Sequence, residues 1–243
     1  ENAPETNRIQ YSIENASRYY VYLPSGIKKV TDGSLKEKKD SRYVSRGFIG
    51  EKNYEIEEIS GSRPSELMVA DDWVSDPQTD AQKEYCEAEA VYRQFVYDNY
   101  TKADAGMSGL INKVFWKDYD TENDGIYSAI SHIREILKEK VQYTENPSEA
   151  PEDADPIRYF LNVSHQGNAM LYASVAVEAL RQHGIPARYI EGYYLPEKEI
   201  SGSQDASVLL DGKDAHAWAE VYFDGIGWLP VDVTPGYYYE SVA

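Results

Sequence analysis

The sequence predicts an α+β protein, with a β-rich N-terminal region over residues 1–75 and helices packed on an antiparallel sheet over residues 76–243. In the first region, apolar residues alternate with polar ones, which is the period of a half-buried strand. After Asp76-Pro77 they recur every three or four residues, as in an amphipathic helix. A nearly all-apolar helical stretch near the end is then followed by three short β-rich runs.

The N-terminal region contains several strand candidates separated by polar segments. The strand pattern is carried by residues 9–13, the aromatic run 18–23, the Gly-bounded segment around Phe48, and residues 54–56. The run 18–23 is closed by Pro24-Ser25-Gly26, which is typical of a turn. The Lys-rich stretch 28–42 is expected to be a solvated hairpin or loop.

Two amphipathic helices are predicted in the middle of the chain. The first covers residues 85–99, and the second covers residues 126–137 after the start signal Asn123-Asp124-Gly125. A loop rich in Pro, Glu and Asp, residues 144–155, separates the second helix from the final third of the chain.

The final third contains the most apolar helix of the chain. It runs from Gly167 to about His183 and ends at Gly184-Ile185-Pro186. Its polar stripe is narrow, so we expect it to be buried and central. The three strands expected after it are 187–195, 216–223 and 228–233, with a turn at Asp224-Gly225 between the last two.

Charge and composition narrow the classes of partner. The formal net charge of −18 repels nucleic-acid phosphates and anionic membrane surfaces, so neither is expected as a partner. No apolar run approaches the roughly 18–20 residues that span a bilayer, so membrane insertion of this chain is not expected. With four histidines and one cysteine, Cys86, neither an intramolecular disulfide nor a zinc site is expected, and no cofactor is indicated.

The last helix and the strands after it offer candidates for two of the three groups of a thiol acyl-transfer site. Acyl transfer by a thiol requires a thiolate at a helix N-terminus, an imidazole to carry the proton, and a carboxylate or amide to orient the imidazole. The helix opens at Gly167-Asn168-Ala169, His216 begins a strand, and Asp232 lies on the next strand. A tight turn between adjacent antiparallel strands makes direct contact between His216 and Asp232 natural.

Four segments, which follow one another in the family's order, resemble the bacterial extracellular type of the transglutaminase-like superfamily. This superfamily has a papain-like thiol-protease core. The four segments are 155–161, the Gly167-Asn-Ala-Met helix start with 179–193 after it, the His-Ala-Trp-Ala-Glu-Val-Tyr strand from His216, and the Val-Asp-Val-Thr-Pro segment around Asp232. The resemblance covers about a third of the chain. It implies a Cys-His-Asp triad in which Ala169 stands at the nucleophile position, His216 is the base and Asp232 orients it.

Ala169 departs from that pattern, because alanine has no nucleophile and the chain is therefore expected to be inactive. Two explanations stay open: an experimenter replaced a cysteine, or the natural protein binds without turnover. The retained His216 and Asp232 favour the first.

The surrounding residues also have simpler interpretations. His216 could be an ordinary strand histidine, and Asp232 could cap the turn at Thr234-Pro235. Gln166 could donate to an oxyanion but is more readily a loop residue, and Cys86 is expected to be a packed structural thiol.

The function expected from the resemblance is a thiol enzyme acting on peptide or protein amides, by hydrolysis or by acyl transfer. The alternative is a naturally inactive module that binds a protein or a cell-wall peptide. Localisation at the cell surface or outside the cell follows from the resemblance. The first residue, Glu1, is not Met, which indicates a processed or trimmed chain, with any signal peptide or anchor out of view.

Overall fold

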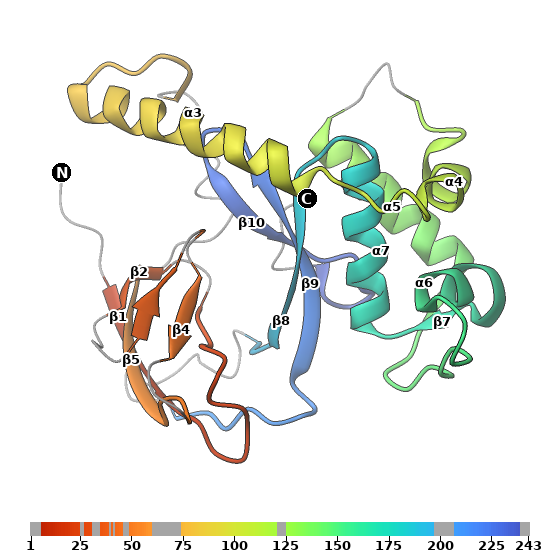
Figure 1. Ribbon diagram of the computed structural model, residues 1–243, viewed down its shortest axis with the longest axis horizontal. Helices are drawn as coiled ribbons and strands as arrows, with labels where there is room; N and C mark the ends of the chain where they lie inside the picture. The colour runs from red at the N-terminus through yellow and green to blue at the C-terminus, as the bar shows by residue number, and fades with distance from the viewer. Residues whose placement is uncertain are drawn as a thin grey trace. The chain divides into compact units, whose positions relative to one another are not determined.

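The computed structural model describes residues 6–24, 27–30, 35–38, 40, 42–45, 49–59, 74–120, 125–196 and 207–238. The chain divides into two compact units, residues 1–63 and 64–243. The separate folding of residues 1–75 and 76–243 stays a prediction. The larger unit is of the expected α+β class (Figure 1).

The N-terminal unit is built from short antiparallel strands. Its three-stranded sheet has the order β1-β5-β2, and a second pair is formed by β3 and β4. The bounds are β1 Thr6–Ser12, β2 Ile27–Val30, β3 Leu35–Glu37, β4 Tyr43–Ser45 and β5 Asn53–Ile59. A small core holds Ile13, Leu35, Tyr54 and Ile56. The strands predicted at residues 9–13 and 54–56 are confirmed, with the first ending at Ser12.

The strand predicted at residues 18–23 is wrong. Residues 18–23 are not part of a strand, and Tyr19 and Tyr20 are largely exposed. The Tyr54 hydroxyl accepts a hydrogen bond from the backbone N–H of Tyr22 at 2.8 Å and lies 3.0 Å from the backbone oxygen of the same residue. A side chain therefore takes the backbone groups that a neighbouring strand would have used. The segment predicted around Phe48 lies outside the described residues.

The larger unit contains the helices. Their bounds are α3 Asp80–Tyr100, α4 Ser108–Ile111, the π-helical turn Asn112–Trp116, α5 Ile126–Lys140, α6 Pro156–Tyr159, the π-helical turn Phe160–Ser164 and α7 Ala169–Gln182. The predicted helices at 85–99, 126–137 and 167–183 are confirmed, the last with Asn168 and His183 as its caps. The π-helical turns carry no recognisable sequence signal. No helix among the described residues is both long and apolar enough to span a bilayer.

A three-stranded antiparallel sheet lies beside α7 (Figure 1). Its order is β10-β9-β8, with β8 Ala187–Tyr193, β9 Ala215–Phe223 and β10 Gly227–Val231. All three predicted strands are confirmed, although Asp232 lies one residue beyond β10. A parallel pair, β6 Gln142–Tyr143 with β7 Gln166–Gly167, leads into α7. Pro230 lies within β10, opposite Glu220.

Helix α7 is buried between the sheet and α5, as its narrow polar stripe predicted. Val175, Ala176, Ala179 and Leu180 have essentially no exposed surface. They share one core with residues of α5 and of β9. Burying each Val or Leu side chain stabilises the fold by about 1.5–3 kcal/mol, and the alanines allow close approach of α7 to the sheet. The start of α7 is therefore held in a fixed place relative to β9.

Helix α3 packs on the turn that joins β9 to β10. The Glu89 carboxylate accepts hydrogen bonds from the Tyr222 hydroxyl at 2.8 Å and from the Gly225 N–H at 2.9 Å. Arg93, one turn along the helix, lies 3.7 Å from the same carboxylate. Only 8% of the Glu89 side chain is exposed, so its loss leaves buried donors without an acceptor.

We expect Glu89→Ala to lower the free energy of unfolding by about 1–3 kcal/mol, because the Tyr222 hydroxyl and the Gly225 N–H lose their acceptor. Urea unfolding followed by circular dichroism measures this. The matched control is Glu87→Ala on the exposed face of the same helix, which carries the same gain in helix propensity. Equal effects of the two substitutions would contradict the proposed anchoring.

Tyr172→Phe should stabilise the protein by about 1 kcal/mol. Tyr172 is fully buried on α7, and within the described part of the chain its hydroxyl has no hydrogen-bond partner. Burial also raises the pKa of Tyr172 to about 12. The folded state therefore keeps this proton between about pH 10 and 12, where the unfolded state loses it, and stability falls as pH rises through that range. Unfolding at pH 7 and pH 11 should give a smaller difference for Tyr172→Phe than for the parent.

Candidate functional site

The candidate nucleophile position is the first residue of α7. Asn168 caps the helix in an extended conformation, and its Oδ1 accepts a hydrogen bond from the Leu171 N–H at 3.3 Å. The side chain of Ala169 therefore lies in the first turn, where the free N–H groups and the helix dipole favour negative charge. Ala169 is 7% exposed, so the position is nearly but not fully covered.

His216 and Asp232 form a buried pair. His216 Nε2 lies 2.6 Å from Asp232 Oδ2, and the two residues are 8% and 7% exposed. The pairing of Val231 with Ala219 sets Asp232 at the end of β10, beside the start of β9. The contact expected from the sixteen-residue spacing is thus observed, and the catalytic role of both residues stays a prediction.

Asp232 is held at three points. Its second oxygen, Oδ1, accepts the Thr234 N–H at 2.8 Å, so the carboxylate caps the following turn as well as binding the imidazole. The two contacts expected of Asp232 from the sequence, with His216 and with the turn at Thr234, are therefore both made by its carboxylate. On α5, Arg134 donates Nε–H and Nη2–H to the backbone oxygen of Asp232, at 2.9 and 2.7 Å. Burial lowers the pKa of Arg134 from its usual value.

Aromatic rings surround the imidazole. The Tyr237 ring stacks on His216 with centroids 4.1 Å apart and planes 18° apart. Tyr237 reaches this place through a turn in which its N–H binds the Thr234 oxygen at 3.1 Å and Gly236 adopts a φ of +96°. Trp218 lies nearly parallel to the imidazole at 6.3 Å. The turn capped by Asp232 therefore also delivers a ring onto the imidazole that Asp232 binds.

The start of α7 meets the start of β9. Ala169, Ala173 and Ala217 form one small buried cluster, with Tyr189 packed against it. Ala217 directly follows His216 in β9, so the cluster links the nucleophile position to the strand that bears the imidazole. Because Asp232 occupies Nε2, Nδ1 is the ring nitrogen left to exchange a proton with a reacting group. Ala169 itself can supply no nucleophile.

The other residues singled out from the sequence take simpler places. Cys86 is half-buried, as expected of a packed thiol. Gln166 is exposed in β7, and His165 before it adopts a left-handed φ of +51°. His132 and His183 lie against Trp116, away from the cluster described above. In the described part of the chain, no group of three or more His, Cys, Asp and Glu side chains could hold a metal ion.

Residues 113–233 match the family model of the transglutaminase-like superfamily. This part of the chain belongs to that superfamily. The match begins in the π-helical turn before α5 and ends at Val233, so it includes α7, β9 and both residues of the pair. The predicted family and the predicted α+β fold of the core are therefore confirmed.

Two curated proteins and one solved structure illustrate the relationship. The chain is 29% identical over 119 residues to the uncharacterized protein YebA of Bacillus subtilis. It is 36% identical over 102 residues to a protein-glutamine gamma-glutamyltransferase of Pseudomonas aeruginosa. These alignments cover 48% and 42% of this chain but only 16% and 14% of the relatives.

The periplasmic domain of TgpA from Pseudomonas aeruginosa, bound to ethylmercury, has a similar fold. Its TM-score is 0.56 at 16% identity, covering 95% of this chain and 75% of that one. At this identity the likeness concerns the fold alone.

Three residues around the candidate site were not anticipated from the sequence: Arg134, Tyr237 and Tyr189. The turn at Thr234 was expected, because an aspartate two residues earlier commonly caps such a turn. Arg134 interrupts the apolar stripe of α5 without any local signal for a partner 98 residues away. Tyr237 and Tyr189 are two among 22 tyrosines, so composition could not single them out.

Tyr237→Leu should shift the imidazole proton signals of His216 downfield in the NMR spectrum, because the ring current of a stacked aromatic is lost. Tyr237→Phe keeps the ring and should leave these signals close to the parent positions. The signals of His132 and His183, which contact Trp116 instead, serve as internal references. A phenylalanine variant that behaves like the leucine variant would argue against stacking in solution.

Proposed function

We propose that this fold serves a transglutaminase-like thiol enzyme acting on peptide or protein amides, with positions 169, 216 and 232 as its triad. The chain described here, with alanine at 169, is an inactive form. The proposal rests above all on the buried hydrogen bond of 2.6 Å between His216 and Asp232. The cluster of Ala169 with Ala217 supports it by linking the start of α7 to the strand of His216.

In the working form, a cysteine replaces Ala169. Nδ1 of His216 takes the thiol proton, and the thiolate attacks the amide carbonyl carbon. The imidazolium then gives its proton to the leaving amine, which departs and leaves a thioester. Attack by water or by a second amine releases the acyl group and restores the thiol. Asp232 holds the imidazole and balances its charge throughout.

The N-terminus of α7 assists the charged steps. Its free N–H groups and dipole favour the thiolate over the thiol, and they favour negative charge developing close to the attacked carbonyl. The curated name of the Pseudomonas aeruginosa relative, protein-glutamine gamma-glutamyltransferase, supports glutamine side-chain amides as substrates. The second substrate decides between hydrolysis and cross-linking.

The partners we infer are peptides or proteins, including cell-wall peptides, met at the cell surface or outside the cell. The periplasmic origin of the TgpA domain supports this placement. The strong net negative charge also favours substrates that carry positive groups.

One observation favours a second function, in which the same fold binds a peptide without turnover. The alanine at 169 is itself that observation, because it removes the nucleophile and leaves the pair intact. The genomic codon at position 169 separates the two readings. A cysteine codon identifies an active natural enzyme, and an alanine codon identifies a binding module.

Ala169→Cys should create a thiol that iodoacetamide labels rapidly, with a pH profile shifted toward acid relative to free cysteine. The helix N-terminus and a protonated imidazole both favour the thiolate. His216→Ala in the same background should abolish the acid shift. Stopped-flow or mass-spectrometric labelling rates between pH 4 and 9 measure both.

Two controls accompany this measurement. The parent chain reports labelling of Cys86 alone. Ser174→Cys places a thiol on α7 just over one turn further along, beyond the reach of the helix start. If the thiol introduced at 169 reacts no faster than that control, the triad assignment fails.

A further inference from the structure

The helix-facing side of the sheet carries a carboxylate close to position 169. Glu191 on β8 lies directly opposite Ala217 on β9 in the strand register. Directly opposed residues of antiparallel strands share a face, with Cβ atoms about 4.5–5.5 Å apart. Because Ala217 belongs to the same cluster as Ala169, Glu191 lies one strand away from the start of α7.

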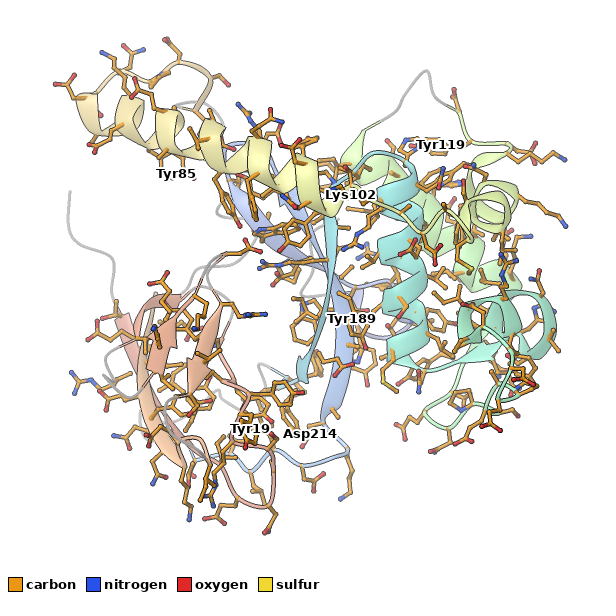
Figure 2. The ribbon with its side chains drawn as sticks, viewed as in Figure 1. Tyr19, Tyr85, Lys102, Tyr119, Tyr189 and Asp214 are labelled. Atoms are coloured by element: carbon orange, nitrogen blue, oxygen red, sulfur yellow. The ribbon has the colours of Figure 1, made fainter. Side chains whose placement is uncertain are left out.

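Tyr189 orients this carboxylate. Its ring packs against the alanine cluster, and its hydroxyl donates a hydrogen bond of 2.7 Å to Glu191 Oε1. Figure 2 labels Tyr189 on β8, the strand beside β9. Burial and the hydrogen bond to Glu191 raise the pKa of Tyr189, so its hydroxyl remains a donor at neutral and moderately alkaline pH. One oxygen of Glu191 is thereby fixed, and the other is left for a ligand.

Among the described residues, Glu191 has no cationic partner, unlike two other carboxylates close to this sheet. Glu220 on β9 is paired with Arg188 at 2.6 Å, and Glu89 lies 3.7 Å from Arg93. Glu191 is exposed, and within the described part of the chain its one recorded partner is the neutral Tyr189 hydroxyl. Its charge is therefore compensated by no side chain there.

We propose that Glu191 forms a subsite for a positively charged group of the substrate, an ammonium or a guanidinium, beside position 169. That this group belongs to a substrate rests on the proposed function, whereas the negative electrostatic potential that Glu191 creates at position 169 does not. An exposed, oriented carboxylate attracts such a group through a charge-assisted hydrogen bond and repels an anionic one. The preferred substrate is a peptide with Lys or Arg next to the reacting amide.

The electrostatic potential at position 169 is measured from the rates at which charged thiol reagents modify the double variant Ala169→Cys, Cys86→Ser. Methanethiosulfonates with a trimethylammonium or a sulfonate group are similar in size and modify a thiolate by the same displacement. The thiolate attacks the sulfenyl sulfur, a mixed disulfide forms and methanesulfinate leaves. The cation-to-anion rate ratio should exceed that of free cysteine, and adding Glu191→Gln should lower this ratio at least about fivefold.

Glu139→Gln is the matched control, since it removes the same charge from an exposed site on α5. If Glu191→Gln leaves the rate ratio unchanged, or if Glu139→Gln lowers it equally, Glu191 is not a local cation subsite. Because this labelling involves no acyl transfer, it decides the subsite even if the proposed enzyme activity fails.

Turnover then tests the substrate class in the Ala169→Cys form. Two glutamine peptides are compared, one with lysine and one with norleucine beside the glutamine, which share the apolar stem and differ in the ammonium. The lysine peptide should have the higher kcat/KM, and Glu191→Gln should bring the two together. Turnover without this preference overturns the subsite and leaves the function intact. No turnover of either peptide overturns the proposed function.

Discussion

The arrangement of the site depends on one buried carboxylate, that of Asp232. Asp232 is almost fully buried, and a buried carboxylate is tolerated only when its oxygens are paired. One oxygen meets the imidazole of His216, the other meets the N–H of Thr234, and the backbone oxygen receives two donors from Arg134. Helix α5, the end of β10 and the start of β9 are thus fixed around one residue. Removing a partner from such a residue costs more than the contact itself is worth.

Asp232 also links the turn after β10 to the position of the Tyr237 ring. By capping the turn after β10, Asp232 directs the chain so that Tyr237 stacks on His216. The imidazole is then held at its edge by a carboxylate and at its face by a ring. The ring of His216 is thereby held in one orientation. The alanine at 169 leaves all of this intact, because no hydrogen bond of the pair involves that side chain.

The features that could be predicted from the sequence are those fixed by local patterns. The helix over α7 followed from its narrow polar stripe, and the strands from short β-rich runs around the Asp224-Gly225 turn. The approach of His216 to Asp232 followed from their spacing across that turn. Arg134, Tyr189 and Tyr237 could not be anticipated, because their partners are set by packing between elements. The strand prediction for residues 18–23 was wrong for a related reason. Its aromatic residues have strand propensity, but the backbone N–H and oxygen of Tyr22 contact the Tyr54 hydroxyl instead of a neighbouring strand.

Pro230 removes one backbone N–H from β10, the strand that ends just before Asp232. β10 is an outer strand of the three-stranded sheet, and proline has no N–H to offer to a further strand. That border is therefore a poor template for an extended polypeptide docking by backbone hydrogen bonds. The opposite border, β8, contains no proline and carries Glu191. A peptide that adds a strand to this sheet would therefore pair more readily with β8, the strand that carries Glu191.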